Sequence, residues 1–366
     1  MATSVVPQIA DVVINIQEII PVPAIGYGNL LIMTEQPTAS ATAGSAVAGQ
    51  STVATSSAPD DSIASSTGGN YKEYTSLDDV AVDYDESSAT YIKAKGYFDQ
   101  SNHGNYLMIV QYPKNKASDT LADFFWNGWY FAVLDNYDAD VATELANMFE
   151  ANAGKFLLLQ VEDYKTLQTL GSQNYTIGLQ HPANEPLDAG LVGSVASLTV
   201  GSQTWKFKNV AGVTPQKYNN TDFTAMKKAH VIVYFTTTGS SVGETSEGFT
   251  LSGEYIDNLH GEIWIKVEMR NRIQARLQDP TTGKISYDKV GIDILEQIVR
   301  DVLSDAWNNG IILTGTDGKG AYDTSFGTRE QQSTTDILAR AYNGGTFWYT
   351  RSGAIHDVTI NGSVMN

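Results

Sequence analysis

The chain has 366 residues, of which 42% are hydrophobic and 10% aromatic, so it has enough apolar material for a folded core. Its formal net charge of −18 at pH 7 would repel a phosphate backbone, which argues against a nucleic-acid partner. The lack of cysteine excludes disulfides, thiolate zinc sites and a cysteine nucleophile, and it favours folding in a reducing cytoplasm.

Residues 1–23 are predicted to form an arm set off from the body. Their start lacks the basic region of a secretory signal, and no stretch of the chain has the roughly 18 uninterrupted apolar residues of a membrane helix, so no membrane anchoring is expected. A strand-like run over 12–20 precedes a Pro-Val-Pro break, which cannot continue a strand ladder. The apolar residues expected to pair with another subunit are Val13, Ile14, Ile16 and Ile19. The two candidate hinges are Pro21 and Pro23.

An α/β body is predicted for residues 24–190. Ala24 to Thr34 reads as a turn and a buried strand, and beyond Tyr71 strand and helix patterns alternate. The predicted strands are 105–112, 128–134 and 155–161, and the predicted helices are 76–84, 87–98, 119–126 and 138–153. Residues 37–70 are almost all small or polar, so a low-complexity insertion without regular structure is expected there.

A β-rich portion is predicted over residues 191–247, because 197–207 and 230–237 alternate like antiparallel strands. Two long helices then begin a C-terminal part that spans 248–351. Thr328 and Gln331 fit a capping box for a last helix that stops at Asn343. The apolar faces of the two long helices are formed by Ile265, Met269, Ile273 and Leu277, and by Ile292, Leu295, Val299, Val302 and Leu303.

A second arm is predicted over residues 352–366. Strand-like residues follow a Ser-Gly break, with Gly353 as the candidate hinge and Ile355, Val358, Ile360 and Val364 as the apolar residues expected to pair. Strand-rich ends beside such breaks suit addition to the sheet of another subunit, because main-chain bonds provide affinity and alternating side chains fix the register. Ordinary edge strands of a single chain would have the same pattern. The predicted fold class is therefore mixed α/β, with a mixed sheet flanked by helices, an inserted β-rich portion and two extended arms.

The sequence contains no convincing pattern of catalytic, cofactor-binding or metal-binding residues. Residues 315–320 lack the spacing of a phosphate-binding loop, and Gly26-Tyr27-Gly28 lacks the third glycine of a dinucleotide loop. The five histidines lie far apart, which gives a zinc site little support. Asp135, Asp138 and Asp140 resemble half a calcium loop. Capping of a helix by Asp138 explains the pattern better.

Arginine is confined to the C-terminal part, since every arginine lies at or after Arg270. The guanidinium fork pairs with carboxylates at two points, so arginines on one part of an acidic chain suggest head-to-tail self-association. Ordinary helix-surface charges explain the distribution equally well. The candidates for charged contacts with adjacent subunits or with a tube are Arg270, Arg272, Arg276, Arg329 and Arg340.

The last third of the chain contains two neighbouring motifs, GFTLSGEYID at residues 248–257 and LHGEIWI at residues 259–265. Together they resemble one segment of the contractile phage tail sheath proteins, in the branch of smaller sheaths. Three later stretches are similar to the family in order and spacing: 284–291, 303–310 and 353–364. Residues 204–212 (TWKFKNVAG) also resemble a stretch of the family. The low-complexity insertion departs from the family pattern.

The resemblance implies a structural protein that polymerises as a helical array around a tail tube and contracts to drive the tube through the host envelope. The implied partners are further copies of the chain in stacked hexameric rings, the tail tube protein, and the baseplate and tail-terminator proteins. The implied location is the virion tail, with assembly in the host bacterial cytoplasm. Two alternatives stay open: another phage tube or shell protein, and an α/β enzyme with an unrecognised site.

Overall fold

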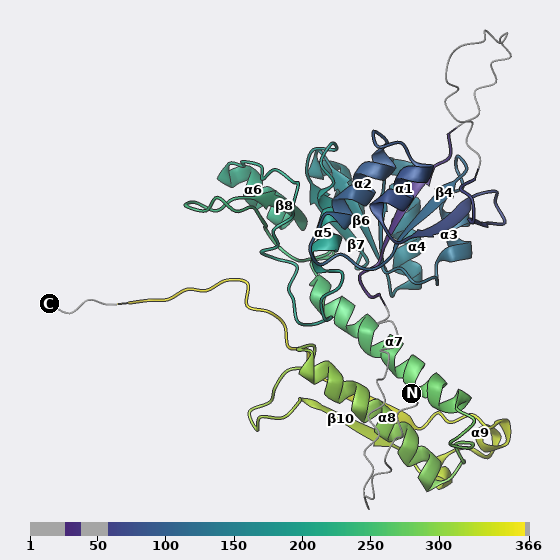
Figure 1. Cartoon of the computed structure of the whole chain (residues 1–366). Helices are drawn as coiled ribbons and strands as arrows, with labels where there is room; N and C mark the ends of the chain where they lie inside the picture. Colours follow the sequence, from purple (N-terminus) through teal and green to yellow (C-terminus); the bar gives the residue numbers. More distant parts are fainter. Residues whose placement is uncertain (1–25, 38–57, 363–366) are drawn as a thin grey trace, which may run out of the picture.

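The computed structural model of the protein describes residues 26–37 and 58–362 (Figure 1). The predicted N-terminal arm and Val364 lie outside the described residues, as does most of the low-complexity segment. Figure 1 shows an α/β body above a second, smaller layer, with helix α7 running from one to the other.

A nine-stranded mixed sheet forms the centre of the body, in the order β2-β3-β4-β1-β5-β6-β7-β8-β9. The central strands from β4 to β8 in this order run parallel, and the pairings at both edges are antiparallel. The strands are β1 (Leu30–Glu35), β2 (Ile63–Ala64), β3 (Asn70–Tyr74), β4 (Leu107–Tyr112), β5 (Phe131–Leu134), β6 (Phe156–Val161), β7 (Thr176–Gln180), β8 (Val231–Phe235) and β9 (Glu244–Thr245).

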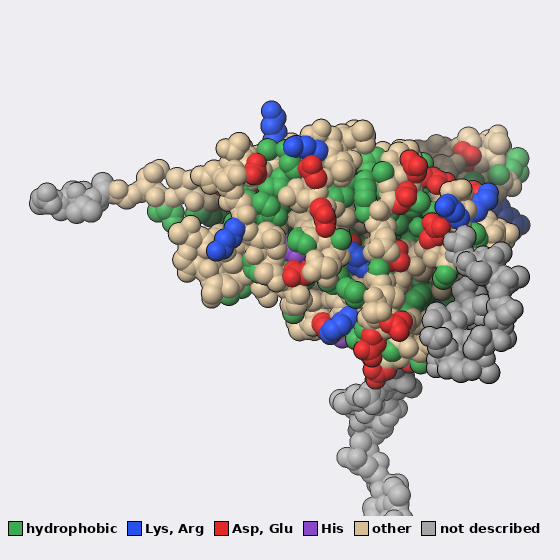
Figure 2. All heavy atoms as spheres, turned by 90° about the horizontal axis from the view of Figure 1, so that it is seen from above, with side chains coloured by type: hydrophobic (Ala, Val, Ile, Leu, Met, Phe, Trp, Pro, Cys, Tyr) green, Lys and Arg blue, Asp and Glu red, His purple; other side chains and the backbone are tan. Residues whose placement is uncertain are grey.

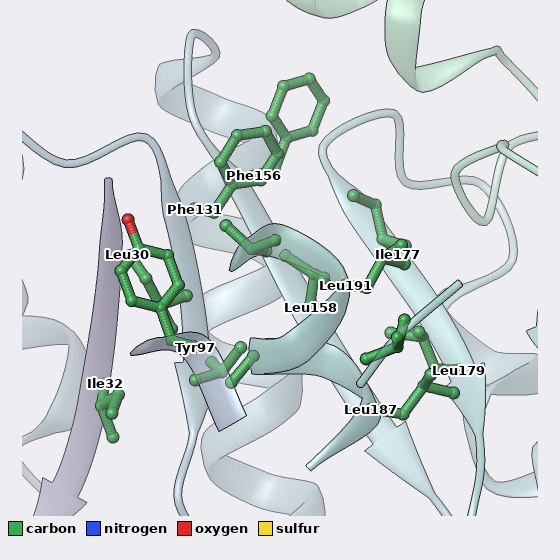
Figure 3. Close-up of a cluster of buried hydrophobic side chains, with 14 of the residues drawn as sticks. Leu30, Ile32, Tyr97, Phe131, Phe156, Leu158, Ile177, Leu179, Leu187 and Leu191 are labelled. Atoms are coloured by element: carbon green, nitrogen blue, oxygen red, sulfur yellow. The ribbon is translucent and has the colours of Figure 1, made fainter. Parts of the chain in front are cut away.

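Helices cover both faces of this sheet, which is why its strands are nearly continuous apolar runs. Successive side chains of a strand point to opposite faces, so Leu30 and Ile32 pack on one side and Leu31 and Met33 on the other. Figure 3 shows the first of these cores. The helices are α1 (Leu77–Asp83), α2 (Ala89–Phe98) and α5 (Leu187–Val195) on one face, α3 (Ala117–Phe124), α4 (Ala139–Asn152) and the 3₁₀ helix η1 (Tyr164–Leu170) on the other, and α6 (Asn220–Lys228) beside β8.

The second layer is built on α7, which takes part in two cores. Its 23 residues make it about 35 Å long. Ile263 packs in the core of the body, whereas Trp264 and Met269 pack against α8 in a core of their own. The elements of this layer are α7 (Ile256–Gln278), α8 (Lys289–Asn308), β10 (Tyr322–Phe326), the 3₁₀ turn η2 (Arg329–Gln331), α9 (Thr334–Ala339) and β11 (Gly345–Tyr349).

The predicted fold class, a mixed sheet flanked by helices, is confirmed. The strand predicted over 197–207 is wrong, because that stretch is a series of turns. Its apolar residues are anchored separately: Val200 packs in the core of the second layer, and the Trp205 ring centroid lies 5.0 Å from that of Phe131. Gly201 breaks the run with a φ of 90°, a left-handed conformation. The alternating pattern therefore comes from separate anchors in two cores.

The other strand predicted in the β-rich portion is present as β8, but its orientation differs from the prediction. It runs parallel to β7 and is antiparallel only to the short β9. The chain between β7 and β8 includes α5 and α6 and is long enough for a parallel crossover. This portion thus extends the sheet of the body, and the domain boundary at 190 stays a prediction.

The expectation of no regular structure over 37–70 is wrong for residues 58–70. Here β2 pairs with β3, and hydrogen bonds to α3 hold the turn between these two strands. The Ser66 N–H and hydroxyl both donate to the Asp123 carboxylate, at 2.7 and 2.8 Å. The hydroxyls of Thr67 and Thr120 lie 2.6 Å apart. Polar contacts and strand pairing replace the apolar burial that this composition lacks.

The last helix is shorter than predicted. Thr328 and Gln331 form the predicted capping box, but it caps only the single turn of η2. The helix α9 has its own cap, in which the Ser333 hydroxyl accepts from the Asp336 N–H at 3.0 Å. It ends where Arg340 adopts a left-handed φ of 55°, which cannot continue a helix. Among the described residues no helix is long and apolar enough to cross a membrane.

Candidate assembly surface

After β11 the chain leaves the second layer as an extended segment, residues 352–362, without a strand partner among the described residues. Figures 1 and 2 show it projecting from the molecule as a narrow extension. Ile355, Val358 and Ile360 are 80%, 74% and 88% exposed. Large apolar side chains on an extended backbone with unpaired main-chain groups are what strand addition requires.

The predicted pairing residues that the structure describes therefore lie where the arm hypothesis needs them, although no contact of the described residues tests pairing itself. The remaining pairing residues and both proline hinges lie outside the described residues: Val13, Ile14, Ile16, Ile19, Pro21, Pro23 and Val364. Their roles stay predictions.

The antiparallel ribbon of β10 and β11 is a candidate acceptor for such an arm. Among the described residues neither strand pairs with a third strand. On its outer face Trp348 is 58% exposed. On the opposite face Thr324, the cross-strand partner of the 44% exposed Phe347, donates to Glu296 of α8 at 2.6 Å. A two-stranded ribbon is marginal in water, so this one depends on α8 and would gain from further strands.

The root of the C-terminal segment is tied to α7. The guanidinium of Arg351 forms ion pairs with Glu254, at 3.2 Å, and with Glu262. The next N–H, of Ser352, donates to the Ile311 carbonyl at 2.9 Å. The candidate hinge Gly353 follows at once, exposed and with a φ of 65° that favours glycine. Nothing in these contacts tests whether the chain bends there.

Three of the five arginines predicted to contact other subunits bond within the chain. Arg272 lies 3.2 Å from Glu268, four residues earlier on α7, and 2.6 Å from Asp305 of α8. The other two donate to backbone carbonyls of nearby loops, Arg276 to Gly283 at 3.1 Å and Arg329 to Tyr287 at 2.9 Å. Arg270 and Arg340 are exposed and form no ion pair among residues 26–37 and 58–362. Charged contacts with a neighbour therefore remain a proposal chiefly for Arg270 and Arg340.

Arg272→Glu is expected to destabilise the isolated subunit, in contrast to the lattice role first predicted for this residue. The change places three carboxylates together, at 268, 272 and 305, and removes the link between α7 and α8. Because the pairs are partly exposed, we expect a loss of about 1–2 kcal/mol, measured by urea unfolding. Arg270→Glu, two residues away on the exposed side, is the matched control and should unfold like the parent. Equal stability of both variants would show that the Arg272 pairs contribute nothing.

The carboxyl ends of the parallel strands, where α/β enzymes usually bind substrates, offer little space. A cavity of about 100 Å³ lies there, against roughly 300 Å³ or more for typical ligand sites. Lys93 donates to both oxygens of Asp188 at 2.7 Å, and Asp135 accepts from Thr34 at 2.7 Å. Burial raises the pKa of the Asp135 carboxyl. Among the described residues no group of three or more His, Asp or Glu side chains could hold a metal ion.

His356 is the residue whose position sequence patterns did not indicate. Within the extended segment 352–362, only the side chain of His356 is buried against the body, and the residues on either side of it are exposed. A histidine within an apolar strand-like run has the same local pattern whether it is anchored or exposed. No short-range signal could therefore have identified this contact.

Comparisons with known proteins identify the fold. No protein-family model and no curated protein matches the chain. Among solved structures, a chain of the contracted helical sheath of the anti-feeding prophage (AFP) is similar, with a TM-score of 0.66 and 13% identity over 98% of this chain and 99% of that one. A chain of the AFP baseplate gives the same values.

A chain of the contracted PVC sheath complex, from an extracellular contractile injection system, has a TM-score of 0.67 and 10% identity over 99% of this chain and 98% of that one. The likeness thus extends over body and second layer alike. At this level of identity it establishes a shared fold.

Proposed function

We propose that the protein is the sheath subunit of a contractile phage tail. In this role it polymerises as a helical array around a tail tube and contracts to drive the tube through the host envelope. The observation that carries the proposal is the extended segment with exposed Ile355, Val358 and Ile360. It is supported by the shared fold, since the similar solved chains come from contractile sheaths and a baseplate.

Subunits would be joined by strand addition. The C-terminal arm of one subunit would pair with the β10–β11 ribbon of a neighbour, whose outer strand edges are free among the described residues. The N-terminal arm, with the strand-like run over 12–20, would pair in the same way. Main-chain bonds hold such a strand, and alternating side chains set its register.

Contraction would be a change between two lattice packings in which the bodies move as near-rigid units and the arms stay paired. A sheet buried on both faces by helices suits a rigid unit. The free energy would be stored as the difference between subunit interfaces in the two states, without nucleotide or other catalysis. The net charge of −18 would oppose premature association.

The partners in this proposal are further copies of the chain in stacked hexameric rings, the tail tube protein, and the baseplate and tail-terminator proteins. The assembled protein would be part of the virion tail, formed in the host bacterial cytoplasm. Exposed Arg270 and Arg340 would contribute charged contacts to neighbours or to the tube, each worth about 0.2–1 kcal/mol but repeated throughout the lattice.

Electron microscopy of the purified protein tests the proposal. A sheath subunit is expected to form long hollow cylinders wide enough to enclose a tube. Narrow tubes would instead support a tail-tube protein. Dispersed monomers at every concentration would favour the enzyme alternative and overturn the proposal.

Replacing residues 38–57 with a short Gly/Ser linker is expected to leave both folding and cylinder formation intact. The residues removed are almost all Ala, Ser, Thr and Gly, which offer little to bury in an interface. The replacement stops before residues 58–70, because these belong to the edge of the sheet. Melting temperature and micrographs of the variant provide the check. Loss of cylinders from a normally folded variant would show that the segment carries an interface.

A further inference from the structure

The side chain of His356 is bound by residues of the body that lie far earlier in the chain, between Thr204 and Tyr255. Its Nε2 lies 2.7 Å from the Thr204 hydroxyl oxygen, and its Nδ1 lies 3.5 Å from a carboxylate oxygen of Glu247. The imidazole meets the Tyr255 ring edge to face, with centroids 4.9 Å apart. The side chain is only 8% exposed. Burying a polar ring with a hydrogen-bond partner and an aromatic neighbour is a specific contact.

The charges around the ring strengthen this contact. Glu247, 4% exposed, is flanked by the ammonium groups of Lys206 at 3.1 Å and Lys227 at 2.6 Å. The Lys206 ammonium also donates to the His356 carbonyl at 3.2 Å and lies 3.6 Å from Asp357. Burial raises the pKa of the Asp257 carboxyl nearby, while the imidazole opposes this rise. These residues therefore bind both the main chain and the side chain of the segment.

The residues on either side of His356 make a sharp contrast. Ile355 and Val358 are 80% and 74% exposed. Five residues before His356, the chain is tied to α7 through Arg351. The segment is thus fixed at two points, 351–352 and 356–357, and beyond the second point it forms no hydrogen bond or ion pair among the described residues.

We propose that Thr204, Lys206, Glu247 and Tyr255 form a docking site for His356 of the chain's own C-terminal segment, and that the arm pivots after Asp357 rather than at Gly353. The docking itself requires no assembly, whereas its meaning for the lattice rests on the proposed function. Moving the pivot by four residues shortens the reach of the free strand by about 13 Å. The acceptor on a neighbouring subunit must then lie that much closer.

The absence of cysteine allows a direct test, because a nitroxide can be attached to a single introduced cysteine. The labels go on Ile355→Cys, between the two fixed points, and on Ile360→Cys, beyond them. Spectra are recorded on the unassembled subunit, verified by ultracentrifugation, so failure to polymerise does not affect the result. We expect restricted motion at 355 and fast motion at 360.

Adding His356→Ala is expected to give the 355 label the fast spectrum of the 360 label, and Thr204→Val should have the same effect from the body side. Val358→Ala, which removes an exposed side chain of the same segment, is the matched control and should leave the 355 label restricted. Circular dichroism checks that each variant is folded. The proposal is overturned if the 355 label is already as mobile as the 360 label in the parent, or if it stays restricted in His356→Ala.

Discussion

Replacing Val358 and Ile360 together by aspartate is expected to abolish cylinder formation while leaving the melting temperature of the subunit unchanged. Both side chains are exposed in the isolated chain, so the fold loses nothing when they become polar. They are two positions apart and would face the same side of a donated strand. Burial of each is worth about 1.5–3 kcal/mol, so the double change would weaken each contact about a hundredfold or more. Sedimentation and electron microscopy measure the loss.

Val82→Asp is the matched control for this experiment. Val82 lies on α1 and is 81% exposed, which is similar to the two arm residues, but it belongs to the α/β body and not to the arm. Its replacement should change neither melting temperature nor assembly. If the double arm variant still formed cylinders like the parent, the donated-strand model would have to be abandoned.

The body of the fold could be predicted because its signals are local. Apolar runs such as 107–112 and 156–161 are long enough to identify buried strands, and Asp138 with Gly154 marks both ends of α4. The direction of a strand is harder to predict from the sequence. Whether β8 runs parallel to β7 depends on the length and path of the chain between them. At 197–207 a local period was mistaken for a strand, since anchors in two different cores produced the alternation.

The assembly surface was predictable only in outline. Exposed apolar residues in an extended segment follow from a strand-like run without a partner in its own chain, which the sequence pattern indicates. The partners of charged residues are set by tertiary packing. Arg272 reaches Asp305, 33 positions away, and His356 reaches Thr204, 152 positions away. Residue type alone does not distinguish such internal contacts from contacts with a neighbouring subunit.

Asp188→Asn is expected to cost the subunit about 3–5 kcal/mol of unfolding free energy, the largest single effect on stability proposed for this protein. The carboxylate is 1% exposed and binds Lys93, 7% exposed, through both oxygens at 2.7 Å. Removing one partner leaves the other buried without its counter-charge. The pair also joins α2 to α5 across one face of the sheet, so urea unfolding should show the full loss.

Lys93→Met combined with Asp188→Leu is expected to recover most of that stability, to within about 1 kcal/mol of the parent. Apolar side chains of similar size need no counter-charge, and such replacements of buried pairs are often neutral. The remaining deficit reflects the Ala189 N–H at the start of α5, which donates to Asp188 at 2.7 Å in the parent. If Lys93 and Asp188 act only in the fold, the double variant should also form cylinders. If the double variant is stable yet fails to assemble while Asp188→Asn assembles from its folded fraction, the pair also contributes to assembly, and a role confined to the fold is wrong.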